Sequence, residues 1–422
     1  MRQGGRDYTE GNGFTFAVLR LPAMPAQTFS TVYSQRDAEV RAALAAVRLP
    51  SERRVEELLD QARCGPMGLA ELAELLEIGA DPEAVGQFER LRAFTLAGWR
   101  KPEGNRVRYV APIYVSSFCV DTCAYCNFSA SRKATARKRL SLEELGAEID
   151  TVMAAGARVI ELVYATDPEF TTELLARYAA RTVEALRGEK GSGVLLCTEY
   201  LSREAYDALK DAGVAGMVQW DETLDRETYD RWHAASPRKR DFQTRMDNHD
   251  RALAAGLEAA TGALFGLADY RYDALMQVAK ARHFASEYGR GPMVFGAARI
   301  KPIAGADLHL KTSASDRAWE TALMVYRMAD PGAGRWLQTR EPFALNLRNL
   351  LDGDVYTYRC GEVTPGGYRQ SGAAQNPLKG GQFGVNELDG EDAGRELAAR
   401  GFRIDYAWIK PKNAAGNGGM AG

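Results

Sequence analysis

From Val107 onward, short β-rich segments alternate with amphipathic helical segments, and this alternation constrains the fold more than any other feature. Repeated strand–helix units indicate a parallel sheet with helices packed outside it. Seven or eight such units within roughly 250 residues favour an α/β fold of the (β/α)8 TIM-barrel type over an open sheet. In such a barrel, catalytic groups gather at the carboxyl ends of the strands.

Hydrophobic periodicity and turn signals give the boundaries of the expected units. The expected strands are Val107–Val115, Val159–Tyr164, Gly193–Cys197, Gly216–Trp220, Ala259–Phe265, Met293–Ala298, Arg335–Thr339 and Val355–Tyr358. The expected helices are Ser141–Gly156, Thr171–Leu186, Ser202–Ala212, Asp241–Gly256, Asp273–Ser286 and Asp316–Met328. The first of these helices opens with Ser141 and Glu144 at the spacing of a capping box.

The same patterns divide the chain into four parts. We expect residues 1–105 to form an N-terminal helical extension and residues 106–360 to form the barrel. Residues 361–412 are expected to be a C-terminal extension that closes the barrel. Residues 413–422 are small and glycine-rich, which predicts a disordered tail.

Composition excludes several classes of protein. Lys and Arg number 54 against 56 Asp and Glu, so the formal net charge of −2 does not suggest a large nucleic-acid-binding surface. The first residues lack the pattern of a secretory signal, and no run of 18 apolar residues predicts a membrane span. Six cysteines are too few for a disulfide scaffold. We therefore expect a cytoplasmic protein without a nucleic-acid or membrane partner.

Three of the six cysteines, Cys119, Cys123 and Cys126, fall within eight residues, directly after the first expected strand. Thiolates select zinc or iron–sulfur clusters, and three cysteines hold three irons of a [4Fe–4S] cube while the fourth iron stays open. A zinc site normally needs four ligands. No histidine is near in sequence, so a fourth ligand would have to come through the fold, for example from Cys197. The alternatives at this point are a cluster, a zinc site and buried inert thiols.

The CX3CX2C motif, with Tyr125 before its last cysteine, resembles the motif of the radical S-adenosylmethionine (SAM) superfamily. The resemblance implies that Cys119, Cys123 and Cys126 bind a [4Fe–4S] cluster whose open iron chelates the methionine part of SAM. It also implies that Tyr125 lies beside the adenine. Such chemistry belongs to the cofactor more than to the protein.

Within this superfamily, Ala111–Ser129 resembles the aromatic amino acid lyases, which include 2-iminoacetate synthases (tyrosine lyases of thiamine biosynthesis) and the tryptophan lyase that makes 3-methylindolic acid. The resemblance extends from about Ala84 to Ile404. Further segments that contribute to it are Asp221–Tyr229, Arg240–Met276, Arg299–Pro302, Thr339–Pro342 and Thr364–Tyr368.

The resemblance also implies roles for individual residues. Arg340 would bind the carboxylate of an amino acid substrate, for which a bidentate guanidinium is suited; the alternative is an ion pair with Glu341. Arg299 and Lys301 would contact SAM or close the barrel. Glu222 and Thr166 are further candidates for binding the cofactor. Thr166 stands where the family usually carries Gly-Glu.

Several other positions depart from the pattern of the tyrosine lyases. Ser117 stands where they tend to have Asn, Asn127 where they have Gly, and Asp221 where they have Gln. Only Cys360 follows Cys197, so the second cluster of the hydrogenase-maturation enzymes has no ligands. These departures suggest a substrate or an outcome different from ordinary tyrosine cleavage.

The function implied by the resemblance is that of a radical SAM carbon–carbon lyase. The 5′-deoxyadenosyl radical would abstract hydrogen from the amine of an aromatic α-amino acid, and a bond at Cα would break. Its partners would be the amino acid and a reductant such as flavodoxin or ferredoxin. One alternative is rearrangement or oxidation of a modified amino acid without cleavage. Another is a non-catalytic iron–sulfur or zinc scaffold for electron transfer.

Two further features have competing interpretations. Five of the eight residues in Arg132–Arg139 are basic, which is typical of a solvated loop or of a loop that closes over a cofactor. Glu199 and Asp221 lie near the ends of expected strands and are candidates for proton transfer.

Overall fold

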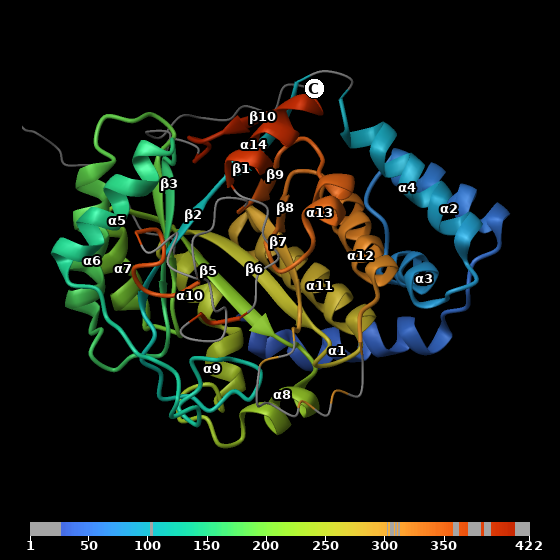
Figure 1. Ribbon diagram of the computed structural model, residues 1–422. Coiled ribbons are helices and arrows are strands. Elements are labelled where there is room, and N and C mark those ends of the chain that lie inside the picture. The colour runs from blue at the N-terminus through green and yellow to red at the C-terminus, as the bar shows by residue number, and fades with distance from the viewer. Residues whose placement is uncertain are drawn as a thin grey trace, which may run out of the picture.

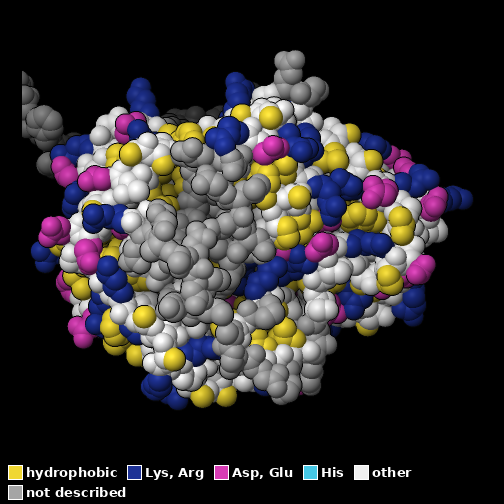
Figure 2. Space-filling model, in the orientation of Figure 1, with side chains coloured by type: hydrophobic (Ala, Val, Ile, Leu, Met, Phe, Trp, Pro, Cys, Tyr) yellow, Lys and Arg dark blue, Asp and Glu magenta, His cyan; other side chains and the backbone are white. Residues whose placement is uncertain are grey.

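The computed structural model describes residues 27–101, 104–301, 303, 308, 310, 313–357, 363–369, 381–383 and 390–409. The expected tail at 413–422 and Cys360 lie outside this part of the chain. No helix in the described residues is long and apolar enough to cross a membrane. Figure 2 shows basic and acidic side chains intermixed on the described surface, in line with their nearly equal numbers.

Four helices precede the sheet and lie to one side of it, next to two of the later helices (Figure 1). They are α1 (Phe29–Ala46), α2 (Glu52–Cys64), α3 (Leu69–Ala80) and α4 (Val85–Trp99). The first turn of α1 is held by two carboxylates of the main domain. Asp250 accepts a hydrogen bond from the Phe29 N–H at 3.0 Å, and Asp247 accepts one from the Ser30 N–H at 2.7 Å.

Ten strands form one sheet in which all neighbouring pairs are parallel. They are β1 (Asn105–Tyr109), β2 (Ala111–Ser116), β3 (Val159–Tyr164), β4 (Gly193–Cys197), β5 (Val214–Glu222), β6 (Glu258–Phe265), β7 (Val294–Arg299), β8 (Gly334–Leu337), β9 (Asp354–Tyr356) and β10 (Phe402–Asp405). Their order is β10-β1-β9-β8-β7-β6-β5-β4-β3-β2.

A single residue, Val110, separates β1 from β2, yet the two strands pair at opposite ends of this order. Val107 pairs with Asp354 of β9, whereas Ala111 pairs with Ile160 of β3. One extended segment therefore joins both ends of the sheet at the amino-terminal side of the strands. Beyond Val110, β2 and β9 are not paired, so the described strands form a partial barrel. The expected (β/α) barrel is confirmed.

The barrel is surrounded by helices. They are α5 (Leu142–Ala154), α6 (Thr172–Ala185), α7 (Arg203–Asp211), α8 (Arg226–His233), α9 (Phe242–Met246), α10 (Asn248–Ala254), α11 (Tyr270–Tyr288), α12 (Asp316–Ala329), α13 (Phe343–Asn349) and α14 (Gly390–Ala399). In α5 to α9, α11 and α12, a Ser, Thr or Asp side chain caps the amino terminus. The predicted capping box of α5 is present: the Glu144 N–H donates to Ser141 Oγ, and the Ser141 N–H donates to the Glu144 carboxylate.

One predicted helix is divided into two in the structure. Asp241–Gly256 was expected to be a single helix, but the structure has α9 and α10 with a break at Asp247. The carboxylate of Asp247 is directed to the start of α1, where it accepts hydrogen bonds from both the N–H and the hydroxyl of Ser30. A contact far away in sequence therefore accompanies the break, and periodicity alone does not reveal it.

Inward-facing side chains fill the amino-terminal end of the barrel. This layer consists of Val110, Val159, Leu195, Val218, Ala260, Val294, Trp336 and Val355. Trp408 and Ile409 pack against it from the C-terminal segment that follows β10. The Trp408 Nε1–H donates to the Tyr109 carbonyl at 2.8 Å, and the Ile409 N–H donates to the Gly191 carbonyl at 2.9 Å. The C-terminal extension thus covers this end of the barrel.

Candidate functional site

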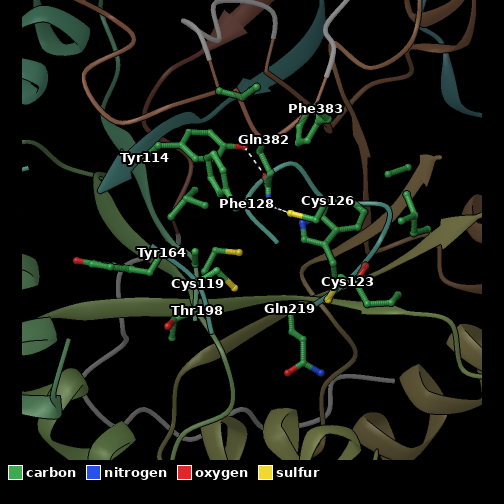
Figure 3. A pocket seen from close by; sticks show the side chains of 18 of the residues that line it. Tyr114, Cys119, Cys123, Cys126, Phe128, Tyr164, Thr198, Gln219, Gln382 and Phe383 are labelled. Carbon is green, nitrogen blue, oxygen red and sulfur yellow. Dashed lines mark hydrogen bonds between the residues drawn. The ribbon is translucent and has the colours of Figure 1, made fainter. Parts of the chain in front are cut away.

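The principal functional candidate is a cavity at the carboxyl ends of the barrel strands. The space inside it is about 1260 Å³, including its open mouth. The cysteine loop after β2 forms one wall, and side chains from β2 to β8 and from the segments that follow the strands form the rest. This is the end of the barrel at which the sequence predicts the chemistry. Figure 3 shows the three cysteines facing the cavity, with Tyr114 and Phe128 beside them.

Cys119, Cys123 and Cys126 all line this cavity. Burial raises the pKa of each thiol, that of Cys123 to about 12. Iron binding would displace these protons, since a coordinating thiol is deprotonated. Within the described residues, no three His, Cys, Asp or Glu side chains converge on one ion position. A cube does not need such convergence, because each cysteine binds a different iron. The donor set therefore fits a [4Fe–4S] cluster.

The loop that carries the cysteines is braced by polar contacts to its backbone. Arg137 donates to the carbonyls of Ser117, Phe128 and Ser129 at 2.7–2.8 Å. Arg139 forms an ion pair with Asp167 at 2.6 Å. The basic run is thus neither a free solvated loop nor a nucleic-acid surface at these two positions. Its arginines hold the cysteine loop in shape.

Tyr125 lies in the cavity wall with its hydroxyl fixed by a histidine. His233 Nδ1 is 2.8 Å from the Tyr229 carbonyl and must donate to it, so its Nε2 accepts from the Tyr125 hydroxyl at 2.6 Å. Burial lowers the pKa of His233 to about 3, which keeps the ring neutral. The Tyr125 ring packs with Leu264 and Ala298. This apolar surface suits a flat aromatic base.

A buried network of alternating charges lies in the cavity wall. Lys239 is paired with Glu222, and Arg245 is paired with Glu199. A second contact of 3.7 Å joins Arg245 to Glu222. Burial alone would raise the pKa of Glu222, but the two cations outweigh it and hold the pKa below its usual range. Glu222 is therefore ionised, as is expected for a carboxylate that binds hydroxyl groups.

Glu222 also has an unusual backbone. It is the only described non-glycine residue with a positive φ, at 65°, and it follows an irregularity in the β5–β6 pairing. Strained backbone of this kind clusters at functional sites. The turn is held from behind by Asp273, which accepts hydrogen bonds from the Thr223 hydroxyl and the Leu224 N–H, both at 2.8 Å.

Arg340 and Thr166 both line the cavity, as expected. The Arg340 guanidinium lies 3.5 Å from the centre of the Phe383 ring, and burial lowers its pKa. The Glu341 carboxylate, the predicted alternative partner, accepts hydrogen bonds from Arg299 and Lys301. The Thr166 carbonyl accepts from the Val120 N–H at 3.0 Å, which joins the segment after β3 to the cysteine loop.

Three expected residues do not line the cavity. Arg299 is paired with Glu341 and with Asp316 at 2.7 Å, and Lys301 is 3.2 Å from Glu341. These contacts join the end of β7 to the segment after β8 and to the start of α12. Asp221 is fully buried on the outer side of the sheet, 3.0 Å from Lys280, so the expected role in proton transfer has no access to the cavity.

Sequence reasoning missed Lys239, Arg245 and Glu161 as cavity residues, whereas Cys197, a candidate fourth thiol, does line the cavity. Lys239 and Arg245 occur in a charged segment that reads like an exposed surface. Glu161 had a signal, because a carboxylate inside an otherwise apolar strand is unusual. Cys64 is exposed at the end of α2, so it does not supply a fourth thiol at this cavity.

Comparison with known proteins agrees with this site. The family model described as Radical SAM superfamily matches residues 113–281, from β2 to α11, and includes the three cysteines. Residues 113–281, which include the three cysteines, thus belong to the radical SAM superfamily. Membership of this superfamily implies a [4Fe–4S] cluster and S-adenosylmethionine as cofactors.

The chain is 28% identical to the 2-iminoacetate synthase of Escherichia coli (strain K12) over 291 residues, which is 68% of this chain and 75% of that protein. It is 27% identical to the 2-iminoacetate synthase of Salmonella typhimurium over 64% of this chain and 70% of that protein. A 3-methylornithine synthase of Methanosarcina acetivorans is 25% identical over 34% of this chain and 40% of that protein. The chain is thus a radical SAM enzyme related to 2-iminoacetate synthases.

Solved radical SAM structures share the fold. HydG, a maturase of the [FeFe]-hydrogenase, superposes with a TM-score of 0.77 at 24% identity, covering 88% of this chain and 80% of that one. Methylornithine synthase (PylB) superposes with a TM-score of 0.65 at 18% identity, covering 82% of this chain and 97% of that one. At these identities the likeness establishes the fold.

Proposed function

We propose that this radical SAM enzyme acts on a free aromatic α-amino acid, takes a hydrogen atom from the amine and breaks a bond at Cα. The observation that carries the proposal is the position of Arg340, a half-buried cation in the wall of the cavity that the three cysteines also line. The similarity to 2-iminoacetate synthases supports the same reaction class.

In this proposal Arg340 binds the substrate carboxylate with two parallel hydrogen bonds. The Phe383 ring, stacked on the guanidinium, limits its rotation. Fixed orientation matters because one particular hydrogen atom must face the radical carbon. When bound, the cluster and SAM would supply a 5′-deoxyadenosyl radical after one-electron reduction by flavodoxin or ferredoxin. Arg340 would hold the substrate with its amine hydrogen within reach of that radical, and the products would be 5′-deoxyadenosine and a fragment of the amino acid.

The remaining cavity residues are assigned to the cofactor. Cys119, Cys123 and Cys126 hold the cluster, and Tyr125 covers one face of the adenine. Glu222, ionised and held by Lys239, accepts hydrogen bonds from ribose hydroxyls. Thr166 lies next to the cysteine loop, where its polar groups support the methionine amine.

A second candidate is conversion of the amino acid without cleavage. The similarity to 3-methylornithine synthases, although it covers only 34% of this chain, favours it over a non-catalytic role. Both candidates begin with the same hydrogen abstraction, and their products differ in mass.

The test is anaerobic incubation of the reconstituted enzyme with SAM, reductant and a panel of amino acids, followed by mass spectrometry. We expect 5′-deoxyadenosine and a cleaved fragment with an aromatic amino acid, and neither with the Cys126→Ala variant. An intact, isomeric or oxidised amino acid product would favour the second candidate. No amino acid-dependent 5′-deoxyadenosine would reject both.

A further inference from the structure

Glu161 is the least explained charged residue of the cavity. It is the third residue of β3 and only 5% exposed, and it lines the cavity together with Val163. Side chains two positions apart on a strand share a face, and Val159 of the same face belongs to the inward layer. Glu161 therefore lies between that apolar layer and the cysteine loop, at the floor of the cavity.

The other glutamates of the cavity wall have basic partners. Glu199 is paired with Arg245, and Glu222 is paired with Lys239. Glu161 is hydrogen-bonded to the thiol of Cys197 on the neighbouring strand β4. Burial raises the pKa of Glu161 to about 8, so at neutral pH it is mostly a carboxylic acid. A thiol is a weak hydrogen-bonding group, and the acid retains capacity for a further bond.

Aromatic side chains make up the rest of this floor. Trp220 of β5 and Trp336 of β8 have ring centroids 6.3 Å apart, and both line the cavity. The Trp220 indole lies directly over Gly262 and Gly296, where a Cβ would come within 2.5 Å of the ring. The backbone of β6 and β7 thus leaves space for an indole. The two indoles and Glu161 thus lie at the same end of the cavity.

We propose that Glu161 selects the substrate by its side chain, accepting a hydrogen bond from an O–H or N–H group carried by the aromatic ring. This inference rests on the proposed function, since it places the carboxylate at Arg340 and the ring at the floor. An aromatic ring without a donor would exclude water from Glu161 without replacing the hydrogen bond. Leaving one buried polar group unpaired lowers affinity by about 10- to 100-fold.

The experiment compares tyrosine, tryptophan and phenylalanine as substrates of the holoenzyme under anaerobic conditions. The readout is kcat/KM for 5′-deoxyadenosine formation, separated into kcat and KM. We expect the native enzyme to prefer a donor-bearing substrate over phenylalanine by about 10- to 100-fold. Lysine is included as a non-aromatic substrate. The inference would be overturned if phenylalanine or lysine gave the highest kcat/KM.

Variants isolate the role of Glu161. Glu161→Gln keeps an uncharged acceptor and should keep the preference. Glu161→Met has a similar shape without the acceptor, and the preference should fall to less than about 3-fold, mainly through KM. Leu162→Met, on the outer face of the same strand, is the matched control and should retain the native preference.

The outcomes are distinguishable. If turnover requires an amino acid but Glu161→Met keeps the native preference, the inference fails and the proposed function stands. If no amino acid promotes turnover, both fail. If Glu161→Met does not fold, Glu161→Gln remains decisive, because loss of the preference in that variant contradicts acceptance by an uncharged group.

Discussion

Arg340 lies in the cavity wall with its guanidinium 3.5 Å from the Phe383 ring centre. Two variants can separate the effect of its charge from that of its bidentate hydrogen bonding. Arg340→Ala should lower kcat/KM by roughly 30- to 1000-fold, because a buried carboxylate would lose its partner. Arg340→Lys keeps the charge but loses the bidentate fork, so it should restore only part of the activity. Steady-state kinetics on the amino acid measure both effects. Iron and sulfide content should be unchanged, and native activity in Arg340→Ala would remove Arg340 from the site.

Gln382 makes a different residue-scale contact, with a cysteine of the cluster motif. Its Nε2 donates to Cys126 Sγ at 3.8 Å, and its Oε1 accepts from the Tyr114 hydroxyl at 3.1 Å (Figure 3). Hydrogen bonds to sulfur stabilise the reduced, more negative cluster. Gln382→Leu should therefore shift the cluster midpoint potential to more negative values, measured by anaerobic titration with electron paramagnetic resonance. Gln382→Glu, which can keep the bond to Tyr114, separates loss of the donor from misplacement of the segment. An unshifted potential in both variants would contradict the contact.

At this scale the sequence identifies residues whose chemistry is tied to a motif. The three cysteines and Tyr125 follow from local spacing, and the structure places all four in one cavity. Lys239 and Arg245 could not be predicted, because their roles come from burial next to groups distant in sequence. Arg299 and Lys301 lie in a motif too, but Glu341 takes up their charges. A motif fixes which residues are near the site, and packing decides where each side chain points.

Among the elements, β6 and β7 each have a glycine, Gly262 and Gly296, where the Trp220 indole packs against the strand. A Cβ at Gly296 would lie 2.4 Å from the Trp220 ring, and one at Gly262 would lie 2.5 Å from it. Gly296→Ala should therefore lower the free energy of unfolding by about 1–3 kcal/mol through overpacking. Adding Trp220→Phe should recover part of the loss. Anaerobic urea unfolding monitors both variants.

The matched control for this pair is a glycine without neighbours. Gly98 in α4 has no atom within 4 Å of its Cβ position, so Gly98→Ala should be neutral or stabilising. Equal destabilisation by Gly98→Ala and Gly296→Ala would show that the indole is not the cause.

Most elements of the barrel could be predicted from periodicity, and their ends from capping residues such as Ser141. What the sequence could not reveal depends on partners far along the chain. The expected strand Val107–Val115 is divided at Val110, because its two halves pair with β9 and β3. The strand β10 was not predicted, since it is short and exists through its pairing with β1. The break between α9 and α10 likewise accompanies a contact with α1.

For the whole molecule, the two ends of the barrel differ in what covers them. Trp408 and Ile409 pack under the inward layer at the amino-terminal end. At the carboxyl end the cysteine loop and Gln382 form the wall of the cavity. Solvent is thus kept from the floor on one side, while ligands enter from the other. This arrangement places Glu161 in a low-dielectric region, and its protonation becomes linked to the stability of the fold.

Two buried acids, Glu161 and Asp273, have pKa values raised to about 8 by burial, against usual values of 4.5 and 3.8. At pH values between the usual and the raised pKa, Glu161 and Asp273 stay protonated in the folded protein but are ionised in the unfolded chain. The contribution of these two acids to stability therefore falls as pH rises from about 4 to about 8 and levels off above it. Glu161→Gln removes one of the two protons, so the variant should gain stability relative to the native enzyme as pH rises through this window.

The measurement is the difference in Tm between Glu161→Gln and the native holoenzyme, at one scan rate under argon, from pH 5 to pH 9. The difference should be small at pH 5, grow by several degrees up to pH 8 and then remain constant. Asp273→Asn should behave in the same way in its pH dependence, although it also weakens the turn after Glu222. Glu199→Gln is the control with opposite electrostatics, because it leaves Arg245 without its partner and should destabilise at neutral pH. A difference in Tm that does not change with pH would contradict a raised pKa of Glu161 in the folded enzyme.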